Sequence, residues 1–144
     1  MIPQERAERS AEMMWQNDAA SKWLGMTLEL IKPGEAIVSL EVKAQHLNGH
    51  QRCHGGFIFA LADSAFAFAC NSYNQVTVAQ SNQITYISPA KLGEMLTARA
   101  IETARTGRSG VYDVEVHGPD NRKIAVFRGQ SRTIKGQHFE EDCL

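Results

Sequence analysis

The chain contains 144 residues, of which 43% are hydrophobic and 22% are charged, and its formal net charge is −1. This ordinary globular composition predicts one domain over residues 1–144 and excludes a disordered or collagen-like chain. Because 15 basic residues balance 16 acidic ones, the chain lacks the basic footprint of a protein that binds nucleic acid in bulk.

Hydropathy and cysteine usage indicate the cellular compartment of the chain. The longest unbroken apolar runs, Phe57–Ala62 and Ala65–Cys70, are six residues each, whereas a membrane-spanning helix needs about 20. We therefore expect no membrane span, and the first residues show no apolar stretch of a secretory signal. Cys53, Cys70 and Cys143 are odd in number and share no repeated spacing. Such cysteines favour a reducing, cytoplasmic location.

The first third of the chain predicts a helix followed by a hairpin. A helix is expected over residues 4–24, because apolar residues recur there at helical spacing. Residues 26–32 and 35–43 are then expected to form two paired strands, joined by the turn signal Pro33-Gly34. Apolar residues alternate with polar ones in the second strand, which predicts one buried face. Residues 44–56 contain Asn48-Gly49 and Gly55-Gly56 and are expected to be loop.

The segment Phe57–Ser72 is different, because twelve of the fourteen residues from Phe57 to Cys70 are apolar and do not sort into one stripe. A helix that is apolar all round is buried on all sides in a soluble protein. An antiparallel sheet that curls around this helix, an α+β fold, is therefore predicted. One small sheet cannot cover the helix completely, so we expect a second copy of the chain to help. The four remaining strands are predicted over Val76–Ile87, Met95–Thr103, Ser109–His117 and Ile124–Ile134.

Asp63 is the exceptional residue of this helix. Burying an ionised carboxylate without partners costs on the order of 5 kcal/mol or more. One interpretation is structural, with Asp63 hydrogen-bonded to the backbone or to Ser64 at a kink. The other is functional, with Asp63 as a general base or nucleophile whose pKa is tuned by burial. We favour the functional interpretation.

Gly55 and Gly56 open the same helix. The first N–H groups of a helix are unpaired and lie at its positive end, and glycine lets a ligand approach them closely. The pair predicts an oxyanion site, although it could also serve only a tight turn. Along one helix Gly55 and Asp63 lie about 12 Å apart. If both serve one reaction, they must come from two subunits, so the catalytic interpretation predicts a site shared across a dimer interface.

Three histidines precede the helix at a spacing of four, His46, His50 and His54, with Cys53 beside the last of them. This spacing occurs in metal sites. Glycines interrupt any helix here, however, so we expect no metal site and expect His54 to orient the glycine turn or to line a pocket. Cys53 and His54 are not expected to form a catalytic pair, because sequence neighbours rarely point at one another.

The stretch Leu47–Ser72 contains the patterns Asn-Gly-His, Cys-His-Gly-Gly and Leu-Ala-Asp. It resembles the hotdog-fold acyl-CoA thioesterases, in particular the phenylacetic-acid-degradation thioesterase family. Ile84–Glu94, Gly110–Glu115 and Val126–Ser131 also match this family in place and order, so the resemblance covers nearly the whole chain. It implies a hotdog fold, in which a curved antiparallel sheet wraps around one long central helix. It also implies homodimers, commonly paired into homotetramers, and an enzyme without a cofactor.

The resemblance implies roles for individual residues. Asp63 matches the family's catalytic carboxylate, and Gly55 matches the glycine whose N–H polarises the thioester carbonyl. Asn48 would help to place water or the carbonyl, and His54 would lie close to the thioester sulfur. Ser81 is the candidate for a strand hydroxyl that assists water in some relatives.

Three basic residues lie in predicted turns, namely Lys91, Arg105 and Arg108. They could hold phosphates by charge-assisted hydrogen bonds or simply be solvated, and the resemblance places the nucleotide of coenzyme A near them. The implied reaction is hydrolysis of phenylacetyl-CoA, or of a ring-hydroxylated relative, to the free acid and coenzyme A. Two alternatives stay open: a dehydratase or hydratase that pairs His54 with Asp63, and a non-catalytic acyl-CoA-binding module.

Overall fold

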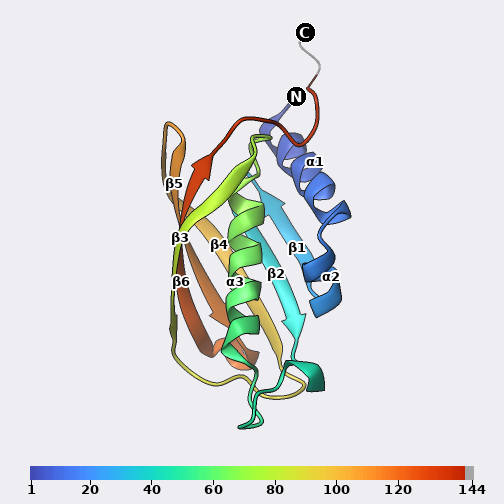
Figure 1. Ribbon diagram of the computed structural model, residues 1–144, viewed down its shortest axis with the longest axis vertical. Coiled ribbons are helices and arrows are strands. Elements are labelled where there is room, and N and C mark those ends of the chain that lie inside the picture. Colours follow the sequence, from blue (N-terminus) through green and yellow to red (C-terminus); the bar gives the residue numbers. More distant parts are fainter. Residues whose placement is uncertain (142–144) are drawn as a thin grey trace.

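The computed structural model describes residues 1–141. Its longest helix packs into the curve of a six-stranded sheet (Figure 1). The predicted architecture, an antiparallel sheet wrapped around one long helix, is thereby confirmed. The elements in chain order are α1 (Pro3–Gln16), α2 (Ala19–Leu24), β1 (Thr27–Lys32), β2 (Glu35–Glu41), the 3-10 helix η1 (Ala44–His46), α3 (Gly55–Cys70), β3 (Thr77–Tyr86), β4 (Met95–Thr106), β5 (Ser109–His117), the 3-10 helix η2 (Pro119–Asn121) and β6 (Lys123–Thr133).

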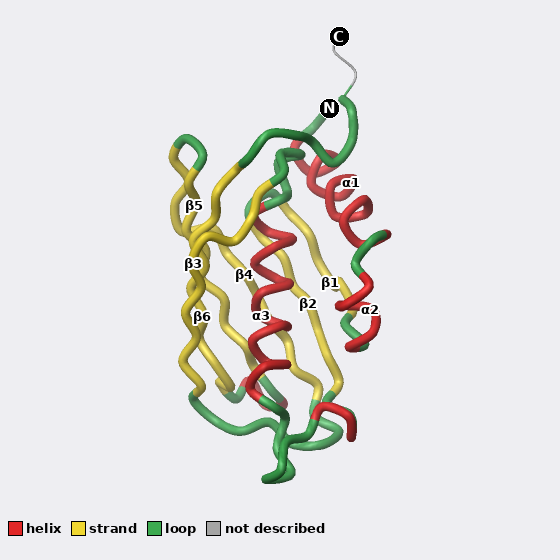
Figure 2. The backbone as a smooth tube through the Cα atoms, viewed as in Figure 1, coloured by secondary structure: helices red, strands yellow, loops and turns green. Residues whose placement is uncertain are grey.

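All strand pairs are antiparallel, and the strand order is β1-β2-β4-β5-β6-β3. The helix α3 lies on one face of this sheet, while α1 and α2 lie beside the β1 edge (Figure 2). The strand β3, which follows α3 directly in the chain, crosses over to pair with β6 and forms the other edge. This crossover places β3 alongside α3, so residues of β3 can contact the helix.

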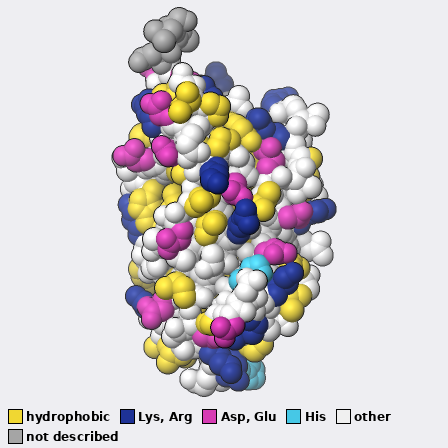
Figure 3. Space-filling view, turned by 180° about the vertical axis from the view of Figure 1, so that it is seen from behind, with side chains coloured by type: hydrophobic (Ala, Val, Ile, Leu, Met, Phe, Trp, Pro, Cys, Tyr) yellow, Lys and Arg dark blue, Asp and Glu magenta, His cyan; other side chains and the backbone are white. Residues whose placement is uncertain are grey.

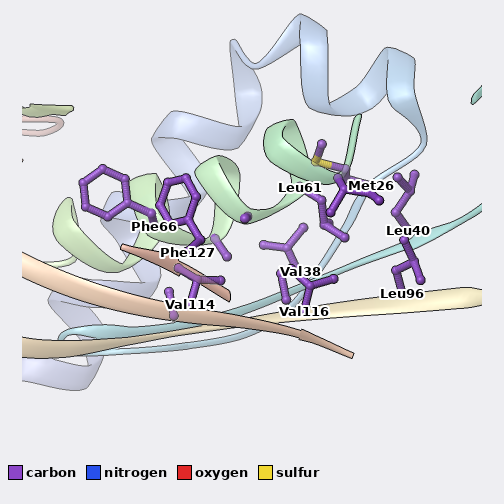
Figure 4. Packing of buried hydrophobic residues seen from close by; sticks show 14 of the residues in the cluster. Met26, Val38, Leu40, Leu61, Phe66, Leu96, Val114, Val116 and Phe127 are labelled. Carbon is purple, nitrogen blue, oxygen red and sulfur yellow. The ribbon is translucent and has the colours of Figure 1, made fainter. Parts of the chain in front are cut away.

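The core lies between α3 and the inward faces of the strands (Figure 4). The predicted alternation of β2 is confirmed, because Ala36, Val38 and Leu40 are at most 1% exposed. Fully burying each valine or leucine side chain contributes roughly 1.5–3 kcal/mol. This packing fixes α3 on the sheet and therefore fixes the direction in which its N-terminus points.

The helices differ from the sequence prediction in three respects. The single helix expected over residues 4–24 is two helices, because the Asp18 side chain accepts a hydrogen bond from the Ser21 N–H (3.0 Å) and caps a new helix. Aspartate favours such caps over helix interiors. The long helix begins at Gly55 rather than at Phe57, and η1 lies within the segment expected to be loop.

One side of α3 is left incompletely covered by the chain's own sheet. Ala60, Asp63 and Ala67 recur at helical spacing and are all half-buried. The strand β3 hydrogen-bonds to β6 along one side alone, which leaves a ten-residue edge free. A free edge of this length is a template for pairing with another strand.

None of the helices within residues 1–141 has the length and apolar character that a membrane crossing requires. Cys53 and Cys70 are buried free thiols. Cys143, the third cysteine of the sequence, lies outside the described residues.

Gly129 of β6 supports the packing of α3 by having no side chain. A Cβ at this position would lie 2.6–2.8 Å from three ring atoms of Phe66, which is 1% exposed. We expect Gly129→Ala to destabilise the protein by about 1–3 kcal/mol through overpacking, measured by chemical denaturation. Gly49→Ala is the matched control, because no atom lies within 4 Å of its added Cβ. Equal stability of the two variants would contradict this account of the core.

Candidate active site

The N-terminus of α3 is held by His54. The Nδ1 atom of His54 accepts a hydrogen bond from the Gly56 N–H (2.9 Å), and the His54 N–H donates to the His46 carbonyl (2.7 Å). The expectation that His54 orients the glycine turn is therefore confirmed. Within residues 1–141 the Gly55 N–H finds no acceptor. One unpaired donor thus remains at the positive end of the helix.

Tyr86, at the end of β3, fixes the same glycine from the other side. Its hydroxyl donates to the Gly55 carbonyl (2.9 Å), and a Cβ at Gly55 would lie 3.2 Å from the nearest atoms of the Tyr86 side chain. Sequence analysis did not single out this tyrosine. No local pattern signals its role, because the contact depends on the crossover that brings β3 beside α3.

A cavity of about 410 Å³ opens at this end of the helix, and Asn48, Gly55 and Tyr86 are among the residues that line it. The Asn48 side-chain oxygen accepts hydrogen bonds from the N–H groups of His50 (2.9 Å) and Arg52 (3.2 Å). Asn48 therefore shapes the loop that forms one wall. Of the predicted site residues, Asn48 and Gly55 line this cavity, whereas His54, which caps the helix, is not among its lining residues.

Asp63 lies two turns further along α3 and does not line this cavity. Its Oδ1 accepts a hydrogen bond from the Asn82 Nδ2 of β3 (3.0 Å). Burial raises the pKa of Asp63, and the hydrogen bond from Asn82 opposes this shift. The structural interpretation of Asp63 named Ser64 or the backbone as its partner. Instead, Ser64 contacts the Ser21 hydroxyl of α2 (3.2 Å), and the recorded partner of Asp63 is an amide on another element.

The β3 residue beside Asp63 is Asn82, which sequence analysis missed, and not Ser81. The register of β3 shifts between Ala79 and Ser81, and beyond this shift Ser81 is exposed whereas Asn82 is half-buried. Since neighbouring strand residues point to opposite faces, Ser81 lies on the outer face of the sheet. A shift of one residue in the alignment of β3 exchanges the faces on which Ser81 and Asn82 lie, so the sequence alone could not tell them apart.

The three basic candidates lie at two ends of the molecule. Lys91 is exposed in the loop before β4, at the end of the sheet where α3 begins (Figure 1). Arg105 and Arg108 lie at the turn between β4 and β5, at the opposite end (Figure 1). The Arg105 guanidinium stacks over the Tyr73 ring, 3.5 Å from its centroid, and its Nε is 3.4 Å from Glu102 Oε1.

The outer face of the sheet carries charges of both signs (Figure 3). Several of them are paired, as in the ion pairs of Arg99 with Glu35 and of Arg128 with Asp113, both at 2.7 Å. A single-sign stripe, which nucleic-acid binding would require, is not seen on this face.

The metal and thiol alternatives find no support in the geometry. His46 is buried, its Nε2 lies 3.1 Å from the Leu24 carbonyl, and its Nδ1 accepts from the Lys43 N–H (2.9 Å). Both ring nitrogens are therefore engaged in holding η1. In the part of the chain that the structure describes, no three His, Cys, Asp or Glu residues cluster as a metal site would need. Burial raises the pKa of the Cys53 thiol to about 11, so this thiol stays protonated near neutral pH.

One long helix wrapped by a curved antiparallel sheet is the architecture of the hotdog fold. Residues 50–125 match the model of the Thioesterase superfamily, and the chain belongs to this superfamily. The predicted fold class and the prediction of a thioester-hydrolysing enzyme are thus confirmed.

Individual relatives agree with this family. The chain is 43% identical over 131 residues to the acyl-coenzyme A thioesterase PaaI of Escherichia coli (strain K12), covering 91% of this chain and 94% of that protein. The solved structure of E. coli PaaI, from the phenylacetic acid degradation operon, matches with a TM-score of 0.92 and 41% identity over 94% of this chain and 99% of that one. The TT0310 protein from Thermus thermophilus matches with a TM-score of 0.76 and 40% identity, over 79% of this chain and 96% of that one.

The burial of Asp63 has a measurable effect on stability. Because its pKa is raised in the folded protein, its stabilising contribution is complete below the unfolded pKa and is lost as pH rises through the folded pKa. We expect Asp63→Asn, which mimics the protonated form, to raise the melting temperature by a few degrees near pH 7. The difference should shrink as pH falls through the raised pKa of Asp63 and should be gone below about 4, the pKa of the unfolded chain.

Asp113→Asn is a control of opposite sign, because the hydrogen bond from Arg128 lowers the pKa of Asp113. This variant should be slightly less stable near neutral pH, and its deficit should disappear in acid. An Asp63→Asn protein that is less stable than the wild type near pH 7 would contradict the assignment of a destabilising buried charge.

Proposed function

We propose that the chain hydrolyses aryl-acetyl thioesters of coenzyme A, with phenylacetyl-CoA or hydroxyphenylacetyl-CoA as substrate. The observation that carries the proposal is the unpaired Gly55 N–H, which lies at the positive end of α3 in a cavity of about 410 Å³. The relative PaaI is named as an acyl-coenzyme A thioesterase and comes from the phenylacetic acid degradation operon. The name supports coenzyme A as the thiol of the substrate, and the operon supports phenylacetyl as its acyl group.

Each proposed site uses two subunits. Gly55 and Asp63 of one chain lie about 12 Å apart along α3, too far to act on one carbonyl. The half-buried side of α3 and the free edge of β3 together form the surface on which a second copy would dock. Antiparallel pairing of the two copies would bring Asp63 of one subunit toward Gly55 of the other. This homodimer, or a tetramer built from it, is the proposed working form.

In the proposed reaction the thioester carbonyl oxygen accepts a hydrogen bond from the Gly55 N–H. Asp63 of the partner subunit removes a proton from water, which attacks the carbonyl carbon, or attacks directly to form a mixed anhydride that water then hydrolyses. Both routes place negative charge on the same oxygen, and each donor at such a site is worth roughly 3–4 kcal/mol. The C–S bond then breaks, and the coenzyme A thiolate takes up a proton.

His54 is proposed to serve the leaving group. Because its Nδ1 accepts a hydrogen bond from Gly56, the neutral ring carries its proton on Nε2. This N–H is available to the thioester sulfur, as the resemblance suggests. Asn48 completes the proposed site as part of the cavity wall.

The proposed coenzyme A contacts also come from both subunits. Antiparallel pairing along β3 would bring the end that carries Arg105 and Arg108 in one copy toward the end that carries Lys91 in the other. Arginine side chains at such a place suit the phosphates of the nucleotide.

Aromatic residues of α3 bear on the acyl group. Phe66 and Phe68 are 1% exposed and belong to the core. Phe57 and Phe59 are half-buried, which leaves these two as the phenylalanines of α3 that can line an aryl pocket. Phe57 also packs against the ring of His54, with centroids 5.7 Å apart, so an aryl group bound there would lie near the cap of the helix.

Free-thiol release from a panel of coenzyme A esters tests the function directly. We expect hydrolysis of the phenylacetyl and hydroxyphenylacetyl esters to exceed that of benzoyl and straight-chain esters. Asp63→Asn should lower kcat by about 10³-fold or more, since it removes the base or nucleophile. Full activity in a folded Asp63→Asn protein would contradict the mechanism. Binding of the esters without thiol release would favour the non-catalytic module, and a new double bond would favour the dehydratase.

The role of the Gly55 N–H can be isolated by two substitutions. Gly55→Pro deletes the N–H at the first position of the helix, where proline is well tolerated, whereas Gly55→Ala adds a Cβ and keeps the N–H. We expect Gly55→Pro to lower kcat by about 10²–10³-fold and Gly55→Ala to lower it much less. Equal losses in the two variants would show that crowding against Tyr86, and not the lost donor, is responsible.

Mixed dimers test whether the site is shared. In a dimer of one Asp63→Asn chain and one Gly55→Pro chain, one site has both groups intact if the sites cross the interface. Mixing the two inactive proteins should then restore up to about half of the wild-type activity per mixed dimer. If each chain held a complete site, mixing would restore nothing.

A further inference from the structure

Asn82 makes one hydrogen bond and leaves another unmade. Its Nδ2 donates to the Asp63 Oδ1 (3.0 Å). Its own Oδ1 is buried, and no donor within residues 1–141 reaches it. Buried polar atoms are nearly always hydrogen-bonded, so an exception calls for an explanation.

The surroundings of Asn82 are built for apolar packing. Asn82 pairs with Gly129 of β6, whose missing side chain makes room for the Phe66 ring. Ile84, two residues along the same face of β3, packs on the hydrophobic core. An apolar side chain of similar size at position 82 would leave no unsatisfied carbonyl in this environment. The amide therefore costs stability, and the group that gains from it is Asp63.

We propose that Asn82 is a positioning residue for Asp63, which it holds by one carboxylate oxygen so that the other, Oδ2, is the oxygen that reacts. The proposal rests on the proposed function of Asp63 and adds a residue to it. Asn82 lies in the same subunit as the carboxylate that it holds. Asp63 and Asn82 of one subunit would thus enter the partner's site together.

Asn82 also favours the ionised form of Asp63, which a base or nucleophile needs. Burial raises the pKa of Asp63, and the hydrogen bond from Asn82 lowers it. In the described part of the chain, no lysine, arginine or histidine forms an ion pair with Asp63. The Asn82 amide therefore stabilises the ionised carboxylate by a hydrogen bond, in the place where an ion pair would otherwise do so.

The other titratable groups around α3 do not take over this role. Cys70 on the same helix has its thiol pKa raised to about 12, chiefly by burial and also by Asp63, and stays neutral. Tyr112 of β5 has a raised pKa as well and donates its hydrogen bond to Glu102 of β4 (2.8 Å). Asp18, which caps α2, accepts a hydrogen bond from the Ser21 hydroxyl (2.7 Å). None of these groups donates a hydrogen bond to Asp63.

The test substitutes Asn82 with leucine, which has a similar volume and no polar atoms. Without the amide, Asp63 should ionise only at higher pH. We expect the acidic limb of the kcat/KM profile for phenylacetyl-CoA to move up by about one pH unit or more. We expect kcat to fall about 10-fold or more, with KM changed less. The melting temperature of the variant checks that it folds.

Two further variants make the result decisive. Gln83→Ala, at an exposed position one residue away on the outer face of β3, is the matched control and should change neither the pH profile nor kcat. Asn82→Ser keeps a short donor and should give an acidic limb between those of the wild type and Asn82→Leu, and it serves as the readout if Asn82→Leu does not fold. An acidic limb that is unmoved in both Asn82 variants would overturn the proposal, whatever happens to kcat.

The outcome is separable from failure of the proposed function. If Asp63→Asn keeps its activity, the role of Asp63 is wrong and the support by Asn82 falls with it. If Asp63→Asn is inactive but the Asn82 variants keep the wild-type pH profile, Asp63 acts without the support of Asn82, and only the positioning role is lost.

Discussion

The burial of the Asp63 carboxylate is the constraint that the surroundings of α3 must satisfy. The carboxylate lies on a helix made almost wholly of apolar residues, where the loss of water raises its pKa, and it receives no ion pair among the described residues. A charge in such a place is tolerated only where its neighbours supply hydrogen bonds. Here the neighbour is an amide on β3, and β3 can reach the helix because it crosses the sheet to become its edge.

Two polar groups lie at different positions along the same apolar helix. Its N-terminus presents a backbone donor and a positive end, and its middle presents the carboxylate. His54 belongs to the N-terminal feature, because its ring caps the helix through Nδ1. The glycines serve this end of the helix differently: Gly55 allows the close approach of Tyr86, and Gly56 supplies the N–H that binds the cap.

Local patterns predicted the parts of the structure that depend on local physics. The strand alternation in β2 and the all-round apolar character of α3 survive in the fold because burial decides both. The break at Asp18 was missed because one capping hydrogen bond outweighs a helical pattern that continues on either side. Asn82 and Tyr86 were missed because their contacts depend on strand register and on the crossover of β3, which no short stretch of sequence encodes. The turns of Lys91 and Arg105 were recognised, but the opposite ends of the sheet on which they lie emerge only from the strand order.

The half-buried side of α3 holds Asp63 between alanines, on the face that the chain's own sheet covers incompletely. Under the proposed shared site, the surface that binds a second copy is therefore the surface that carries the reactive group. Assembly and turnover then obey one mass-action law, and the activity per chain falls on dilution below the dimer dissociation constant. A substitution that weakens the interface would therefore lower the activity even far from the substrate, and the loss would be larger at lower protein concentration.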